Sequence, residues 1–172
     1  MSWVCKTCGE SHESVPLSWA ADYPDRYANM KPEDRDNRTV IGSDQCIIDD
    51  EEFYIRACME IPIVGSADIF LWGLWARVHP EDFDEISEFW EEEGRETRCG
   101  PYKVRLANDV KEYPGGTLNT KMTLRLRPVK ERPLLFGDEP DHPLTIAQRD
   151  GMTEDQVHAM VEDLLHPAKS IS

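Results

Sequence analysis

The segment Cys5-Lys6-Thr7-Cys8-Gly9-Glu10-Ser11-His12 restricts how this chain can fold more than any other part of its sequence. Two cysteines separated by two residues can point at one ion, and a following glycine permits a tight turn that directs backbone amides at the sulfurs. Thiolates and imidazoles are the ligands that zinc prefers, and a structural site needs four of them. The segment therefore predicts a structural zinc site in which Cys5, Cys8 and His12 supply three ligands.

The fourth ligand must come from farther along the chain. We prefer Cys46, because it begins a predicted strand against which the N-terminal segment can dock, and Cys58 and Cys99 remain alternatives. Inert buried thiols and redox chemistry are the other interpretations of the cysteines. A redox pair needs a strand-to-helix junction in a thioredoxin-like unit, and no such pattern surrounds the motif.

The N-terminal composition and the hydropathy of the chain indicate where it resides. No apolar run approaches the roughly eighteen residues that a membrane-spanning helix needs. The first residues have neither a basic stretch nor an apolar one, so we expect no signal peptide and a cytoplasmic protein. Its thiols would then stay reduced.

The net charge of −15 limits the classes of partner. Nucleic acids and anionic membranes require neutralisation by Lys and Arg, so we expect neither as a partner. A basic protein would be attracted instead. The charge is uneven: residues 80–96 carry nine acids and one base, whereas residues 97–132 carry nine bases and three acids.

Alternating and β-branched patterns predict the strands. A short run at residues 46–48, an acidic turn and a longer run at residues 53–61 indicate a hairpin. A further strand at residues 70–78 has one predicted core face, formed by Trp72, Leu74, Ala76 and Val78. Two more strands, at residues 103–106 and 121–127, alternate basic with apolar residues.

Helical signals flank these strands. An acidic helix is predicted at residues 80–93, after Pro80. Helices at residues 143–166 include a capping box formed by Thr153 and Gln156. Residues 16–42 have no sustained period and are expected to be mostly loop, with a short helical turn after Pro32.

These elements predict one α+β domain spanning residues 1–172, with a mainly antiparallel sheet and helices on one of its faces. The metal-binding segment occupies residues 1–15, the sheet occupies residues 43–136 and the C-terminal helices occupy residues 143–166.

Basic side chains on the last two predicted strands form a second candidate site. They could line a site for an anionic ligand, although we favour the simpler interpretation that they face solvent or neutralise the acidic helix. The residues are Lys103, Arg105, Lys121, Arg125 and Arg127.

A combination of short motifs resembles a bacterial family of uncharacterised proteins, domain of unknown function 2199. The motifs are Cys5-x-x-Cys8-Gly9-x-x-His12, Pro16-Leu17, Ser43-Asp44-x-Cys46, Arg56, Glu60-Ile61-Pro62, Trp72-Gly73-x-Trp75, Leu118-Asn119, Arg132-Pro133 and Asp141-His142-Pro143-Leu144 followed by Gln148-Arg149-x-Gly151. The resemblance implies a bacterial cytoplasmic protein and implies that Cys5, Cys8, His12 and Cys46 act as a set.

Two functions from different classes are compatible with the sequence. The first is a non-catalytic, zinc-stabilised binding protein, such as an inhibitor or an immunity-type protein for a basic partner. The second is a small zinc- or thiol-dependent enzyme, either a hydrolase or a redox protein. We prefer the first, because the sequence contains no recognisable catalytic motif.

Overall fold

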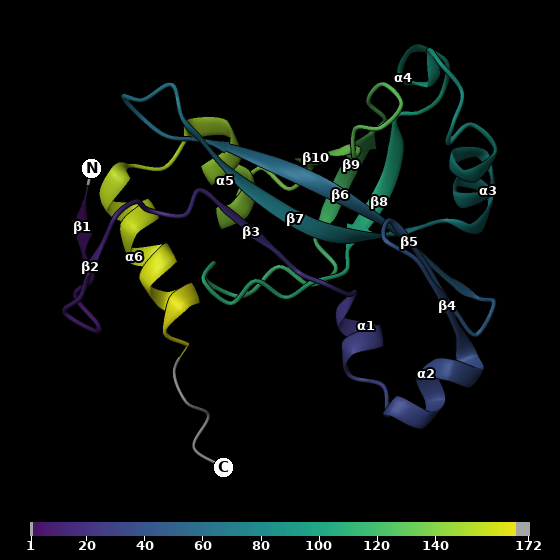
Figure 1. Cartoon of the computed structure of the whole chain (residues 1–172). Helices are drawn as coiled ribbons and strands as arrows, with labels where there is room; N and C mark the ends of the chain where they lie inside the picture. Colours follow the sequence, from purple (N-terminus) through teal and green to yellow (C-terminus); the bar gives the residue numbers. More distant parts are fainter. Residues whose placement is uncertain (1, 168–172) are drawn as a thin grey trace.

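The computed structural model describes residues 2–167, which form an α+β fold as the sequence predicts (Figure 1). The strands are β1 (Trp3–Val4), β2 (Ser11–His12), β3 (Ser18–Ala20), β4 (Thr39–Ile41), β5 (Gln45–Ile48), β6 (Glu52–Pro62), β7 (Ile69–Val78), β8 (Tyr102–Leu106), β9 (Lys121–Arg125) and β10 (Leu134–Gly137). The helices are α1 (Asp25–Ala28), α2 (Pro32–Arg38), α3 (Pro80–Glu88), α4 (Arg95–Arg98), α5 (Pro143–Asp150) and α6 (Glu154–Leu165).

The strands form a small hairpin and a large, partly closed sheet. Strands β1 and β2 pair only with each other within the described residues, and the larger sheet has the order β3-β7-β8-β9-β10-β6-β5-β4. Because β6 also pairs with β7, the strands β6, β7, β8, β9 and β10 close into a barrel. The closing pair, β10 with β6, is parallel, as is β3 with β7, whereas the other pairs are antiparallel.

The long hairpin of β6 and β7 carries the core. Its ladder runs without interruption from the pair Phe53–Val78 to the pair Pro62–Ile69. The predicted core face of β7 is confirmed, because its residues belong to the main hydrophobic cluster. Trp75 points to the opposite face and is also buried, in a second cluster beneath α1. Coverage of both faces explains why this strand is almost continuously apolar.

Residues 16–42 are more ordered than the sequence suggests. The helical turn expected after Pro32 is present as α2, but β3, α1 and β4 were not expected. Strands β3 and β4 extend the sheet at its two ends and are three residues long. Such short strands carry too few residues to show a period in the sequence.

The acidic helix is shorter than predicted, because α3 ends at Glu88 instead of residue 93. The next residues form tight turns, in which the Trp90 N–H donates to Ser87 and the Glu92 N–H donates to Phe89. The Trp90 carbonyl, which would continue the helical ladder, instead accepts a hydrogen bond from the Arg95 guanidinium. The chain therefore leaves the helical path after Glu88, and the Arg95 side chain satisfies the Trp90 carbonyl.

The C-terminal helices agree with their sequence signals. The capping box is present, with the Thr153 hydroxyl accepting from the Gln156 N–H and the Gln156 side chain accepting from the Thr153 N–H. Helix α6 buries Val157, Met160 and Val161 in the main core.

A search of the described residues for a helix long and apolar enough to cross a membrane finds none.

Candidate metal centre

The N-terminal hairpin brings its two cysteines onto one tight turn. The Cys5 N–H donates to the Glu10 carbonyl at 2.9 Å, and the Gly9 N–H donates to the Cys5 carbonyl at 2.8 Å. Gly9 has a φ of 74°, a left-handed conformation that favours glycine. The turn places Cys5 and Cys8 on the same side of the hairpin, and β2 then carries His12 back beside them.

Four ligand-type side chains meet at this turn. Their ligand atoms all lie within 4.8 Å of one another, and the residues are Cys5, Cys8, His12 and His166. The Cys8 Sγ lies 3.7 Å from the His12 Nε2. In a tetrahedral zinc site, normal Zn–S and Zn–N bonds separate a sulfur and a nitrogen ligand by about 3.6 Å. The cluster could therefore hold a metal ion with little rearrangement.

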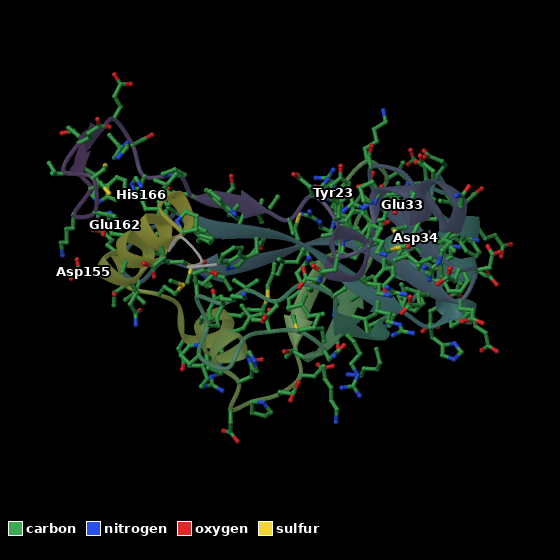
Figure 2. All side chains as sticks on the ribbon, turned by 90° about the horizontal axis from the view of Figure 1, so that it is seen from below. Tyr23, Glu33, Asp34, Asp155, Glu162 and His166 are labelled. Carbon is green, nitrogen blue, oxygen red and sulfur yellow. The ribbon has the colours of Figure 1, made fainter. Side chains whose placement is uncertain are left out.

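His166 comes from the opposite end of the described chain, directly after the last turn of α6. Figure 2 shows His166 and Glu162 on the side of α6 that faces the hairpin. The His166 Nε2 is buried and finds no hydrogen-bond partner among the described residues. A buried polar atom without a partner is unfavourable, and a metal ion bound through Nε2 would satisfy it.

Two further contacts hold the hairpin against α6. The Lys6 N–H donates to the Glu162 carboxylate at 2.9 Å. The buried Trp3 ring lies between His12 and His158, with ring centroids 4.9 Å and 5.7 Å away. The Lys6–Glu162 and Trp3–His158 contacts join the hairpin to α6 without involving the four ligand-type side chains.

The two thiols have pKa values that differ in direction. Burial raises the pKa of Cys5, but hydrogen bonds from the backbone of Cys8 and Thr7 outweigh it, so the pKa lies below the usual thiol value. For Cys8, which is exposed, the backbone N–H of Glu10 lowers the pKa, but partial desolvation and the adjoining Cys5 raise it above the usual value. The second thiolate is thus disfavoured beside the first, and a bound cation would remove that repulsion.

Comparison with known proteins places the chain in a family. The model of a family described as "Uncharacterized protein conserved in bacteria (DUF2199)" matches residues 4–152. The chain belongs to this family. The match confirms the resemblance seen in the sequence, and it includes Cys5, Cys8 and His12 but ends before His166. Neither the curated proteins nor the solved structures yield a match to the chain.

In this DUF2199 protein, Cys46 does not lie with the other ligand-type residues, which corrects our choice of fourth ligand. Cys46 is on β5, in the second core cluster with Tyr54 and Trp75, whereas Cys5 belongs to the main cluster. Strand β5 and the hairpin lie at opposite ends of the molecule (Figure 1). Burial, and secondarily Glu52, raises the pKa of Cys46 to about 12, which suits an inert core thiol.

The alternatives to Cys46 also lie apart from the cluster. Cys58 is on β6 and Cys99 follows α4, and both are buried free thiols.

Sequence reasoning missed His166 because it lies 154 positions after His12 in the chain. Its position at a helix C-terminus has an ordinary explanation, since a histidine there interacts favourably with the helix dipole. The available signal was a histidine at the end of an amphipathic helix, but only docking of that helix makes it a ligand candidate.

Proposed function

We propose that this protein is a non-catalytic binding protein whose N-terminal hairpin and C-terminal helix are joined by one structural zinc ion. The observation that carries the proposal is the convergence of two cysteines and two histidines within 4.8 Å. A set of two sulfur and two nitrogen ligands is typical of structural zinc. Four protein ligands leave no open position for substrate, which supports a structural role over the alternative of a zinc enzyme.

The hairpin needs such a cross-link. Each of its strands has two residues, and an isolated two-stranded hairpin is marginally stable in water. Only Trp3 and Cys5 are buried there, while Val4 and Cys8 are exposed. Zinc binding would therefore contribute directly to the folding free energy of this end of the molecule.

Metal analysis of the wild-type protein and of variants tests whether one zinc ion binds at the four ligand-type residues. The purified protein should hold about one zinc ion per chain, as expected for one four-ligand site. His166→Ala should lose it at a chelator concentration that leaves wild type loaded. His158→Ala is the matched control, because His158 lies on α6 and contacts Trp3 but is not one of the four. Cys46→Ser should also keep the zinc.

The outcomes separate the two functional classes. Cobalt substitution should give the tetrahedral spectrum of a two-sulfur, two-nitrogen site. A site with three protein ligands and one water would support the enzyme instead. A protein that binds no zinc, or a His166→Ala variant that binds zinc like wild type, would contradict the proposal.

The acidic segment at residues 80–96 is the surface that we propose for a basic protein partner. Eight of its nine carboxylates are exposed, and none forms an ion pair within the described residues. Unpaired charges on one surface increase the association rate of an oppositely charged partner.

Charge-matched variants test this surface with an oligolysine peptide as the probe. A triple variant, Glu91→Gln with Glu92→Gln and Glu93→Gln, should weaken binding of the peptide. The control removes three exposed acids elsewhere, at Asp22, Glu33 and Asp36. Equal weakening by both variants would show that only the net charge matters and would contradict a defined surface.

A further inference from the structure

Three cations stand in a row across neighbouring strands of the barrel. The register pairs Arg77 on β7 with Arg105 on β8, and Arg105 with Lys121 on β9. All three residues are exposed, while their neighbours Ala76, Leu106 and Met122 are buried. The strand alternation predicted for Arg105 and Lys121 is therefore correct, and β7 adds a cation that the sequence did not point to.

Two of the three cations in this row, Arg105 and Lys121, have no carboxylate partner among the described residues. Like charges directly opposite each other on adjacent strands are destabilising. Within the described residues, Arg77 has one carboxylate partner, Glu52, at 3.6 Å. Arg105 donates to the carbonyl of Asn119 at 3.2 Å, and the Lys121 ammonium has no partner among those residues. With 34 acidic residues in the chain, this concentration of positive charge stands out.

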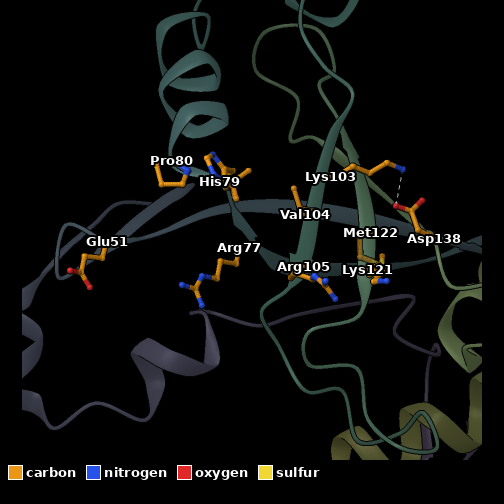
Figure 3. A pocket seen from close by; sticks show the side chains of 11 residues that line it. Glu51, Arg77, His79, Pro80, Lys103, Val104, Arg105, Lys121, Met122 and Asp138 are labelled. Atoms are coloured by element: carbon orange, nitrogen blue, oxygen red, sulfur yellow. Dashed lines mark hydrogen bonds and ion pairs between the residues drawn. The ribbon is translucent and has the colours of Figure 1, made fainter.

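The row borders a cleft of ≈ 570 Å³ that opens where β7 leaves β8. The ladder between these strands has two register pairs, Ala76–Leu106 and Arg77–Arg105, after which β7 passes through His79 into α3. Figure 3 shows the basic side chains around this opening. The remaining walls include the apolar residues Val78, Val104 and Met122. An apolar surface bordered by a few polar groups is the usual form of a small-molecule site.

The other charged residues that line the cleft limit the number of negative groups that the ligand can carry. Lys103 is already paired, with Asp138 at 3.0 Å and with the Thr123 hydroxyl at 2.9 Å. Asp138 and Glu51 also line the cleft and would repel a second negative group placed near them. A ligand with one compact anionic group at the row and an uncharged body beside the apolar wall would use the cations and avoid repulsion by Asp138 and Glu51.

We propose that this cleft binds a small organic phosphate, with its phosphate group on Arg77, Arg105 and Lys121. Guanidinium groups bind phosphate oxygens through paired hydrogen bonds, and a lysine adds a compact charge. A polyanion such as a nucleic acid is disfavoured, because the net charge of −15 repels it along its whole length. The site lies apart from the metal cluster and does not depend on the proposed zinc.

Binding measurements on the full, zinc-loaded chain test the site with four probes: inorganic phosphate, adenosine monophosphate, adenosine and a short oligodeoxynucleotide. Calorimetry at low salt should show saturable binding of adenosine monophosphate, weaker binding of inorganic phosphate and none of adenosine. Tighter binding of inorganic phosphate than of the nucleotide would exclude a role for the apolar wall and overturn the organic part of the proposal.

A matched pair of variants shows whether the row is responsible. Arg105→Gln with Lys121→Gln should weaken binding of adenosine monophosphate at least tenfold, with a thermal midpoint equal to or above that of wild type. Lys111→Gln with Arg125→Gln removes the same charge from exposed positions outside the cleft and should change affinity less than twofold. Equal weakening by both pairs, no saturable binding, or tighter row-dependent binding of the oligonucleotide would overturn the proposal.

Discussion

Replacing Arg95 with alanine should lower the free energy of unfolding more than replacing any exposed charged residue with alanine. Arg95 is 1% exposed, and its guanidinium donates to backbone carbonyls of two separate segments. The acceptors are Trp90 at 2.6 Å, Arg127 at 2.8 Å, Glu131 at 2.9 Å and Pro128 at 3.4 Å. The guanidinium also lies over the Trp90 ring, 4.9 Å from its centroid. One side chain thus joins the turns after α3 to the connection between β9 and β10.

The magnitude follows from these contacts. The three short hydrogen bonds are partly buried, and a typical intramolecular hydrogen bond contributes about 1 kcal/mol to stability. Their loss therefore gives about 3 kcal/mol, and loss of the packed methylenes adds about 1 kcal/mol. We therefore expect Arg95→Ala to lower the free energy of unfolding by about 4 kcal/mol. For a chain of this size the thermal midpoint should fall by about 8–16 °C.

Urea unfolding of the full-length chain, followed by tryptophan fluorescence, measures the effect. Arg98→Ala is the control, because Arg98 is exposed and only stacks on Phe89, 5.1 Å from the ring centroid. It should change the free energy of unfolding by no more than about 0.5 kcal/mol. Arg95→Lys should recover only part of the loss, since an ammonium cannot span all these carbonyls. A loss below about 1 kcal/mol for Arg95→Ala would refute the reasoning.

Three further predictions concern the metal, alkaline pH and backbone packing. Removal of the metal by a chelator should increase hydrogen exchange in the hairpin of β1 and β2 and in α6, but not in the barrel. Unchanged exchange after proven metal removal would count against a structural ion. Burial raises the pKa of Tyr54 and of Tyr113 to about 12, so the folded state retains these protons more strongly than the unfolded state. Stability should therefore be complete below about pH 10 and fall between about pH 10 and 12, with phenolate absorbance rising together with unfolding; titration of both tyrosines near pH 10 in the folded protein would contradict this. Gly137→Ala should destabilise by about 1–3 kcal/mol, because its Cβ would overlap the buried Thr145 side chain. Gly42→Ala, where a Cβ meets no atom within 4 Å, should be nearly neutral in the same denaturation assay.

Local patterns in the sequence determined the elements whose signals lie within one segment. The alternation in β8 identified a strand and its buried face, because neighbouring side chains of a strand point to opposite sides. In β7 and β9 the predicted core residues are buried, but Trp75 and Thr123 on the other faces are buried too, and β9 ends at Arg125 instead of residue 127. The capping box fixed the start of α6 through bonds between Thr153 and Gln156. Cys5, Cys8 and His12 were brought together by a single turn, so their spacing alone was enough to group them.

Contacts between distant segments were decided only by the tertiary structure. Barrel closure depends on the parallel pairing of β10 with β6, and the fourth member of the candidate metal-binding cluster depends on the docking of α6 against the hairpin. The burial of Arg95 and the alignment of Arg77 with Arg105 likewise depend on strands and turns that meet in space. Sequence periodicity indicates which face of an element is apolar, but it does not indicate which other element will cover that face. The four features above depend on which elements pack together.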